Sequence, residues 1–331
     1  MRLELRPGYL VLTLVLSAAF GLWYLSTAFL LPQSEVSFHA RLMTTSPFVY
    51  RLLIPYTLSL VLPLGVLDSA ALKLGFAVAS AWATFLLLPA YAERLFGFRC
   101  EGKQALATAL TCFAMLVAHY CLTRPFMFYY IYDLPSIPLY MASVLLLTRS
   151  RTSLSWGAIA FVLVASLNRE TVVIALLHAL AWHAPTEGAW LARLQRMKPV
   201  LLQAALLVGA MILVRLVLTG LIQPAGDGQA AFMEGENVRI VANVQRIMSE
   251  GLHAQAMLLL GCGALVWLPL GWRDFPPPRQ LLVLSSVPAF VLLLVVGNMT
   301  ELRIYGEFVP ALAVGLWLFV QATWPKGRLR T

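Results

Sequence analysis

Residues 152–183 read TSLSWGAIAFVLVASLNRETVVIALLHALAWH, an apolar stretch that is interrupted once, at Asn168-Arg169-Glu170. A helix that crosses the hydrocarbon core of a bilayer needs about 20 apolar residues, and a charge at membrane depth costs about 2.5–3.5 kcal/mol. We therefore predict two short helices, 152–167 and 170–183, which form a hairpin with the polar residues at its tip. Broken backbone at that depth is tolerated only beside protein or a water-filled cavity, so we expect a cavity at the tip. A single tilted helix is the alternative.

The composition of the chain is that of a polytopic membrane protein. Of its 331 residues, 60% are hydrophobic and 12% are charged, whereas soluble domains carry about 25% charged residues. No polar stretch is long enough for a large soluble domain, so we expect one all-α integral membrane domain, 1–331. The net charge of +9 is explained by basic cytoplasmic loops, and no nucleic-acid partner is expected.

Apolar runs of the length of a membrane span occur at eight further places. They cover residues 9–31, 70–92, 104–122, 130–148, 200–221, 253–271, 279–297 and 304–324. The run 48–66 carries Arg51, Pro55 and Pro63, and we expect it to form a re-entrant or interfacial helix after the first span.

The distribution of basic residues predicts the topology. If 48–66 does not cross and 152–183 crosses twice, the termini and the most basic loops fall on one side of the membrane. These loops are 93–103, 149–153, 184–199 and 272–279. By the positive-inside rule this side is cytoplasmic. The sequence thus predicts about ten membrane segments in the inner (cytoplasmic) cell membrane, with both termini cytoplasmic.

Polar residues from five segments gather on the opposite, non-cytoplasmic side in this topology. These segments are the loop 32–51, the turn from Arg124 to Asp133, the hairpin tip, the loop 222–252 and the stretch from Asn298 to Glu307. Within 222–252, apolar residues share one face of a helix from Asn237 to Gly251, and polar residues line the other. We expect this amphipathic helix to lie flat on the outer membrane surface.

Ten residues on this side are candidates for a functional site. The candidate catalytic carboxylates are Asp133, Glu170 and Glu35, and the candidates for binding a substrate or a phosphate are Arg124, Asn168, Arg169, Glu301, Arg303, Tyr132 and Arg51. Arginine binds phosphate in a bidentate geometry and stabilises the charge of a phosphate leaving group. A carboxylate can deprotonate an acceptor hydroxyl. No metal-ligand set is evident, since Glu35 and His39 alone form a weak pattern.

Three of these carboxylates and arginines also have a structural interpretation. Asp133 suits the N-cap of a helix as well as it suits a catalytic base. Arg169 and Glu170 point in different directions on a helix, so each needs a partner from another segment. Ion pairs of Arg169 with Glu301, or of Glu170 with Arg303, would supply such partners.

The sequence resembles the polytopic GT-C-type membrane glycosyltransferases, which use sugars linked to lipid phosphates. The resemblance rests on Glu35 and an interfacial helix after the first span, on Tyr132-Asp133-Leu134-Pro135, on Asn168-Arg169-Glu170-Thr171, and on Glu301-Leu302-Arg303 with Pro310. It implies a polyprenyl-phosphate-type sugar donor and a lipid or glycan acceptor on the non-cytoplasmic face. Glu35 stands alone where these enzymes commonly show an acidic pair. The catalytic base therefore stays open between Glu35 and Asp133, and a divalent cation stays open as cofactor.

Two other functions fit the same architecture. A surface-polysaccharide polymerase or ligase would use arginines of the outer loops, above all Arg239 and Arg246. A transporter or flippase for a lipid-linked substrate would use the hairpin at 152–183, since broken helices build substrate sites near the membrane midplane. The sequence has no Walker A, GxGxxG, HExxH or GxSxG pattern, so no nucleotide cofactor is expected. Membrane lipids and proteins of cell-envelope biosynthesis are the partners that these functions imply.

Overall fold

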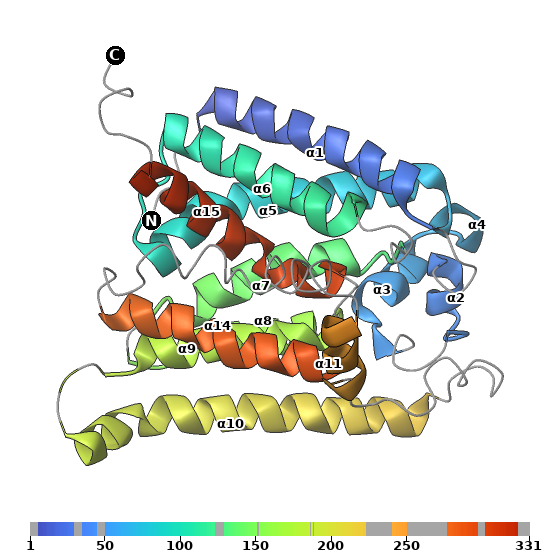
Figure 1. Cartoon of the computed structure of the whole chain (residues 1–331). Coiled ribbons are helices and arrows are strands. Elements are labelled where there is room, and N and C mark those ends of the chain that lie inside the picture. Colours follow the sequence, from blue (N-terminus) through green and yellow to red (C-terminus); the bar gives the residue numbers. More distant parts are fainter. Residues whose placement is uncertain are drawn as a thin grey trace.

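The computed structural model describes residues 6–29, 35–44, 50–122, 129–150, 152–185, 187, 189–222, 240–249, 277–296 and 302–323. These residues form helices and no extended strand, which confirms the all-α prediction for this part of the chain. The helices of ten or more residues, except α11 (Ile240–Ser249), run side by side in one bundle (Figure 1). They are α1 (Pro7–Thr27), α5 (Ala70–Phe96), α6 (Lys103–Cys121), α7 (Asp133–Leu147), α8 (Trp156–Ser166), α9 (Ile174–His183), α10 (Trp190–Leu221), α14 (Pro277–Val296) and α15 (Val309–Thr323).

Local sequence signals set the ends and the spacing of the long helices. The Ser69 side chain accepts a hydrogen bond from the backbone N–H of Leu72 at the start of α5, and Gly97 ends this helix with a φ of 63°. Gly21 allows α1 to approach α5 closely, because a Cβ at this position would lie 2.9 Å from Val78 Cγ2.

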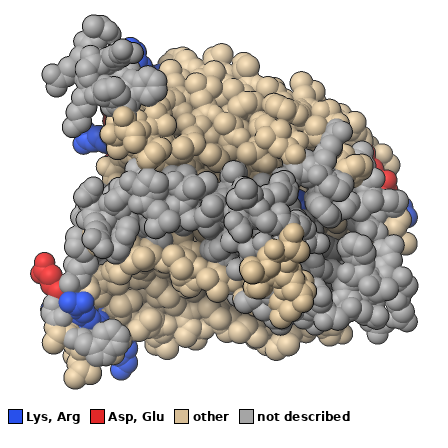
Figure 2. Space-filling view, in the orientation of Figure 1, with Lys and Arg blue, Asp and Glu red and all other residues tan. Residues whose placement is uncertain are grey.

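Five units in the described part of the chain are long and apolar enough to cross a membrane. They are α1, α5, α6, α10 and α15 together with the 3-10 helix η6 (Leu302–Phe308) that precedes it. Figure 2 shows that the described side chains in the middle of the visible face are almost all uncharged. A wide uncharged band of this kind is expected where lipid tails surround a protein. The chain is thus a membrane protein by the length and composition of its helices.

The polar ends of the bundle separate into two groups (Figure 1). One end holds the start of α1, the end of α15 and the connections after α5, α7 and α9; we call it the basic end. Its described basic residues are Arg6, Arg94, Arg99, Lys103, Arg149, Arg193, Arg196 and Lys198. The other end, which we call the site end, holds the end of α1, the start of α7 and the end of α10. The structure therefore groups the described basic loops, 93–103, 149–153 and 184–199, as the charge pattern predicts, while most of the loop 272–279 and of the termini lies outside the described residues.

The stretch 152–183 is a hairpin, as predicted, and not a single tilted helix. Only a short connection separates the end of α7 from α8, and α9 returns to the same level, where His183 Nε2 lies 3.2 Å from the carbonyl oxygen of Leu147. The tip between α8 and α9 lies at the site end, where Asn168 Nδ2 donates a hydrogen bond to the carbonyl oxygen of Tyr132 at 2.9 Å. The short 3-10 helix η3 (Glu170–Val173) connects this tip to α9.

Three short helices follow α1 at the site end: α2 (Val36–Ala40), α3 (Leu53–Val61) and α4 (Leu64–Leu67). With nine residues α3 is about 13 Å long, too short to cross a bilayer, as predicted for the run 48–66. The helices α7, α8 and α9 are also below span length, and the predicted segment 253–271 lies outside the described residues. The count of about ten membrane segments therefore stays a prediction.

The amphipathic helix predicted in the loop 222–252 is present as α11 (Ile240–Ser249). In Figure 1 it runs across the direction of the long helices, beside the end of α14. Its apolar residues Val241, Val244 and Met248 are exposed, whereas Asn243 is buried. A helix with this orientation and an exposed apolar face suits the predicted position along the membrane surface.

Cysteine labelling tests the topology. Met248→Cys at the site end and Arg196→Cys at the basic end place single exposed thiols on opposite sides of the membrane. The background is low because Cys100, Cys112 and Cys121 are buried, and Cys262 is first replaced by alanine. In intact cells a membrane-impermeant maleimide is expected to label position 248 and not position 196. Labelling of both positions from outside would contradict the placement of the site end and the basic end on opposite sides of the membrane.

Candidate functional site

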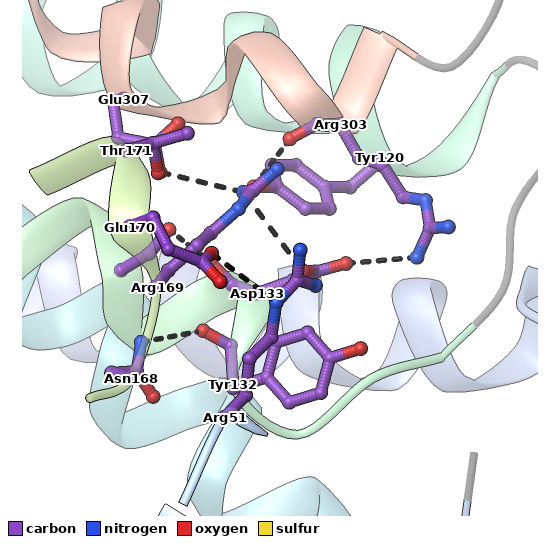
Figure 3. Close-up of polar contacts among 11 residues, drawn as sticks. Arg51, Tyr120, Tyr132, Asp133, Asn168, Arg169, Glu170, Thr171, Arg303 and Glu307 are labelled. Carbon is purple, nitrogen blue, oxygen red and sulfur yellow. Dashed lines mark hydrogen bonds and ion pairs between the residues drawn. The ribbon is translucent and has the colours of Figure 1, made fainter. Parts of the chain in front are cut away.

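A buried network of two acids and two arginines lies at the start of α7 (Figure 3). Asp133 is the first residue of α7 and its side chain is almost fully buried. Arg303 Nη1 donates a hydrogen bond to Asp133 Oδ2 at 2.8 Å, and Arg169 Nη1 lies 3.8 Å from Asp133 Oδ1. Asp133 therefore connects α7 to both the hairpin tip and η6. The interpretation of Asp133 as the N-cap of α7 is wrong, because Tyr132 is the N-cap residue and the Asp133 carboxylate pairs with the two arginines.

Glu307 completes the buried network. Arg169 Nη1 lies 3.4 Å from Glu307 Oε1, which also accepts a hydrogen bond from the Thr171 hydroxyl. Glu307 is fully buried, as are most atoms of Arg169 and Arg303. Two carboxylates and two guanidiniums balance in charge, as buried ionic groups must if the cost of removing them from water is to be offset. We call Asp133, Arg169, Arg303 and Glu307 the buried network.

Backbone contacts fix the segments that carry this network. The Tyr120 hydroxyl donates to the carbonyl oxygen of Arg303 at 3.4 Å, and it packs directly on the backbone of Gly306 in η6. Together with the bond from Asn168 to Tyr132, these contacts tie η6 to α6 and the hairpin tip to α7. These contacts fix both η6 and the turn between α8 and η3, which carries Arg169, against the neighbouring helices.

A second, more accessible group lies beside the hairpin tip, and we call it the surface triad: Arg51, Glu170 and Arg215 (Figure 3 shows the first two). Glu170 Oε2 lies 3.7 Å from Arg51 Nε, and Glu170 Oε1 lies 2.9 Å from Arg215 Nη1. The side chain of Glu170 is 43% exposed, that of Arg215 31% and that of Arg51 14%. Among the residues of the two groups, these three can meet a ligand without disruption of the buried network.

Aromatic rings hold both arginines of the surface triad. The guanidinium of Arg51 lies 4.6 Å from the ring centroid of Tyr132, and that of Arg215 lies 4.2 Å from the ring centroid of Tyr50. A cation over an aromatic face gains about 0.5–2 kcal/mol, more where water is excluded. The two guanidiniums thus have supports that do not depend on Glu170.

The charge state of Glu170 follows from its two neighbours. Burial by itself would raise the pKa of this carboxyl, but the guanidiniums of Arg51 and Arg215 outweigh burial and hold the pKa below its ordinary value. Glu170 lies at the hairpin tip, outside the helices of span length. It is therefore ionised at neutral pH. If an anion binds Arg51 and Arg215 in its place, the pKa of Glu170 will rise.

Several buried polar side-chain atoms in and beside the two groups have no hydrogen-bond partner among the described residues. Tyr132 Oη, Asn168 Oδ1 and Glu307 Oε2 are among them. An unsatisfied buried polar atom costs about 1–3 kcal/mol, and such atoms in native proteins often mark a place where function demands them. Glu307 belongs to the buried network, and Tyr132 contacts both Asn168 and Arg51 of the surface triad. Unsatisfied polar atoms at this end of the bundle favour a polar ligand there.

The structure brings together seven of the ten candidate residues: Asp133, Asn168, Arg169, Glu170, Arg303, Tyr132 and Arg51. Glu35 stands apart, partly exposed before α2, and the structure shows it in no ion pair with the described residues of either group. Arg124 and Glu301 lie outside the described residues. The suggested pair of Glu170 with Arg303 is wrong, because Arg303 binds Asp133 while Glu170 binds Arg51 and Arg215.

Sequence reasoning missed the role of Arg215 and the pairing of Glu307. Arg215 stands in the apolar run of α10, where a charge is costly, and that cost was the available signal for a partner. Glu307 follows Arg303 by four residues on η6, and its Oε1 lies 3.4 Å from Arg169 Nη1, a partner far away in the sequence. Among the described residues no group of three or more His, Cys, Asp or Glu side chains is placed to hold a metal ion.

Comparisons with protein-family models, with curated proteins and with solved structures find no match for this chain. The arrangement of the site and the chemistry of its residues are therefore the basis for a function.

Proposed function

We propose that this protein is a membrane glycosyltransferase that moves a sugar from a polyprenyl-phosphate-type lipid donor to a lipid or glycan acceptor. One observation carries the proposal: an accessible carboxylate, Glu170, stands between two arginines at the end of a membrane bundle. These are the groups that sugar transfer from a lipid phosphate needs. Under this proposal the reaction occurs on the non-cytoplasmic face of the cell membrane, since the basic loops occupy the other end.

Each part of the site has a role in this reaction. The acceptor hydroxyl oxygen attacks the anomeric carbon of the donor, and its proton passes to Glu170. The bond from that carbon to the phosphate oxygen breaks, and the bonding electrons stay on the phosphate. Arg51 and Arg215 stabilise the charge that develops there. The buried network holds the backbone of the hairpin tip, which carries Glu170, in a fixed position.

The test is a transfer assay with the purified protein reconstituted in liposomes. A panel of radiolabelled polyprenyl-phosphate sugars is supplied, and the transfer of label to endogenous or added acceptors is measured. Glu170→Gln is expected to lower the rate about a hundredfold, since a positioned general base contributes about 10²–10⁴-fold. The matched control is Glu187→Gln, an exposed carboxylate at the basic end, which is expected to leave the rate unchanged.

Two results would reject the proposal. One is the absence of transfer from every donor of the panel, together with unchanged lipid-linked and surface glycans in cells that lack the protein. The other is a Glu170→Gln variant that transfers sugar as fast as the wild type.

A transporter or flippase for the same kind of lipid is the second candidate, favoured by the hairpin of α8 and α9, whose polar turn packs against the start of α7. Liposomes separate the two functions. A flippase moves an intact lipid-linked sugar across the bilayer without an acceptor, whereas a transferase leaves its donor on one side and releases the lipid phosphate.

A further inference from the structure

The position of Glu170 is unusual for a catalytic base, because its carboxylate already has two cationic partners. Its two oxygens divide between Arg215, at 2.9 Å, and Arg51, at 3.7 Å. A phosphate group placed between two guanidiniums would make the same kind of contact, with an oxygen towards each. The carboxylate therefore occupies the place that an anionic ligand would take.

We propose that the Arg51–Arg215 pair is the binding site for the phosphate group of a lipid, and that Glu170 is an internal substitute which this phosphate displaces. The inference rests on the proposed function, since it concerns the same site. It adds that Glu170 occupies the phosphate position before the donor binds, and it adds the order in which Glu170 leaves and the phosphate enters.

The two arginines are prepared to receive a phosphate. Arg51 lies over Tyr132 and Arg215 lies over Tyr50, so both guanidiniums keep a support when Glu170 leaves. Tyr132 is fully buried, and Tyr50 packs against Ile222 just after the end of α10. Preformed donors of this kind reduce the cost of ordering the site when a ligand binds.

Glu170 is free to move in a way that the acids of the buried network are not. Its side chain is 43% exposed, whereas Asp133 and Glu307 are enclosed. Its displacement removes one negative charge from beside Arg51 and Arg215, and the single negative charge of a phosphodiester can replace it. The displaced carboxylate then loses the guanidiniums that hold its pKa low, and it becomes a stronger base at the moment when the donor is bound.

The surroundings of Arg215 indicate that the phosphate carries a lipid tail. On α10 the neighbouring side chains Ile212, Leu213, Leu216 and Val217 are apolar and exposed. Such a surface on a helix of span length faces lipid tails. A phosphate at Arg215 can therefore keep its hydrocarbon chain along α10, which a soluble phosphate would not use.

The experiment measures binding to the full-length protein in detergent, without turnover. The probe is a polyprenyl monophosphate, and the comparison ligands are the corresponding polyprenol and inorganic phosphate. Removal of the competing carboxylate by Glu170→Gln is expected to tighten binding of the lipid phosphate about three- to tenfold. Arg215→Gln is expected to weaken it about tenfold or more, and Arg196→Gln, an exposed arginine on the same helix, is expected to have no effect.

Several outcomes would overturn the inference. Glu170→Gln that binds the lipid phosphate no tighter than the wild type would exclude displacement. Equal binding of polyprenol would exclude the phosphate as the recognised group, and equal competition by inorganic phosphate would exclude the lipid tail. If Glu170→Gln does not yield monodisperse protein, Glu170→Asp replaces it, since the shorter side chain competes less and must also tighten binding.

The binding assay and the transfer assay can fail independently. Tighter binding by Glu170→Gln without transfer from any sugar donor would retain the phosphate site and reject the glycosyltransferase. If sugar transfer depends on Glu170 but Glu170→Gln binds the lipid phosphate no tighter than the wild type, the glycosyltransferase proposal is retained and the displacement of Glu170 by phosphate is rejected.

Discussion

Asp133→Asn is expected to leave little folded protein in the membrane. Asparagine has nearly the same size as aspartate but no charge, so Arg303 loses its partner at 2.8 Å and Arg169 keeps only Glu307. Removal of one partner from a buried ion pair costs about 3–5 kcal/mol, because the other charge stays buried without compensation. Most domains are stable by only about 5–15 kcal/mol in total. The measurements are the abundance of the protein in membranes and its unfolding temperature in detergent.

A double variant separates the loss of charge balance from other effects of the substitution. In Asp133→Asn/Arg303→Met the charge that would be stranded is also removed, so stability is expected to recover in part. The control is Asp68→Asn. The Asp68 carboxylate accepts a hydrogen bond from the backbone N–H of Ser37 at 3.2 Å, and asparagine keeps an acceptor there. A single Asp133→Asn variant as stable as the wild type would contradict the role assigned to the buried network.

Gly306→Ala is expected to disrupt the site through a residue that carries no chemistry. A Cβ at position 306 would overlap the hydroxyl oxygen of Tyr120 and lie 3.1 Å from its ring carbon Cζ. The Tyr120 ring cannot retreat easily, because it packs edge-on against Tyr24 and Phe20, with centroids at 5.8 Å and 6.3 Å. Overpacking of this kind costs about 1–3 kcal/mol or more. It also displaces η6, which carries Arg303.

The matched control for Gly306→Ala is Gly209→Ala in the middle of α10, where an added Cβ meets no atom within 4 Å. This control is expected to keep stability or to raise it slightly, since alanine favours a helix over glycine. A second variant, Gly306→Ala/Tyr120→Phe, removes the hydroxyl that clashes and is expected to regain part of the lost stability. Equal unfolding temperatures for Gly306→Ala and Gly209→Ala would exclude the steric explanation.

The sequence alone led to the elements of this site but not to their pairing. A charge in an apolar chain is costly, so Asp133, Arg169 and Arg303 were expected to need partners, and the structure places them together. Which residues pair depends on the direction in which each side chain leaves its helix, and this direction changes with every residue. The last span was expected to begin at residue 304 as an α-helix, whereas Leu302–Phe308 is a 3-10 helix and its Glu307 pairs with Arg169.

Arg215 shows a second limit of reasoning along the chain. An arginine near the end of an apolar helix commonly extends its side chain to the membrane surface, and nothing in the run 200–221 distinguishes that case from an ion pair. The partner, Glu170, is far away in the sequence and lies on a hairpin whose tip position is set by packing against α7. Only the three-dimensional arrangement joins them.

The helix α10 carries Arg215, one half of the proposed phosphate site, along a surface that faces lipid. Its apolar run, residues 200–221, extends about 33 Å, close to the roughly 30 Å of a hydrocarbon core, and the helix packs mainly on the short helices α8 and α9. A long helix with few neighbours adjusts to bilayer thickness by changing its tilt. Such a change moves Arg215 relative to Arg51, which stands on a different segment. If the two arginines bind the lipid phosphate as proposed, we expect bilayer thickness to change the separation between them, and lipid composition to change the affinity for the phosphate.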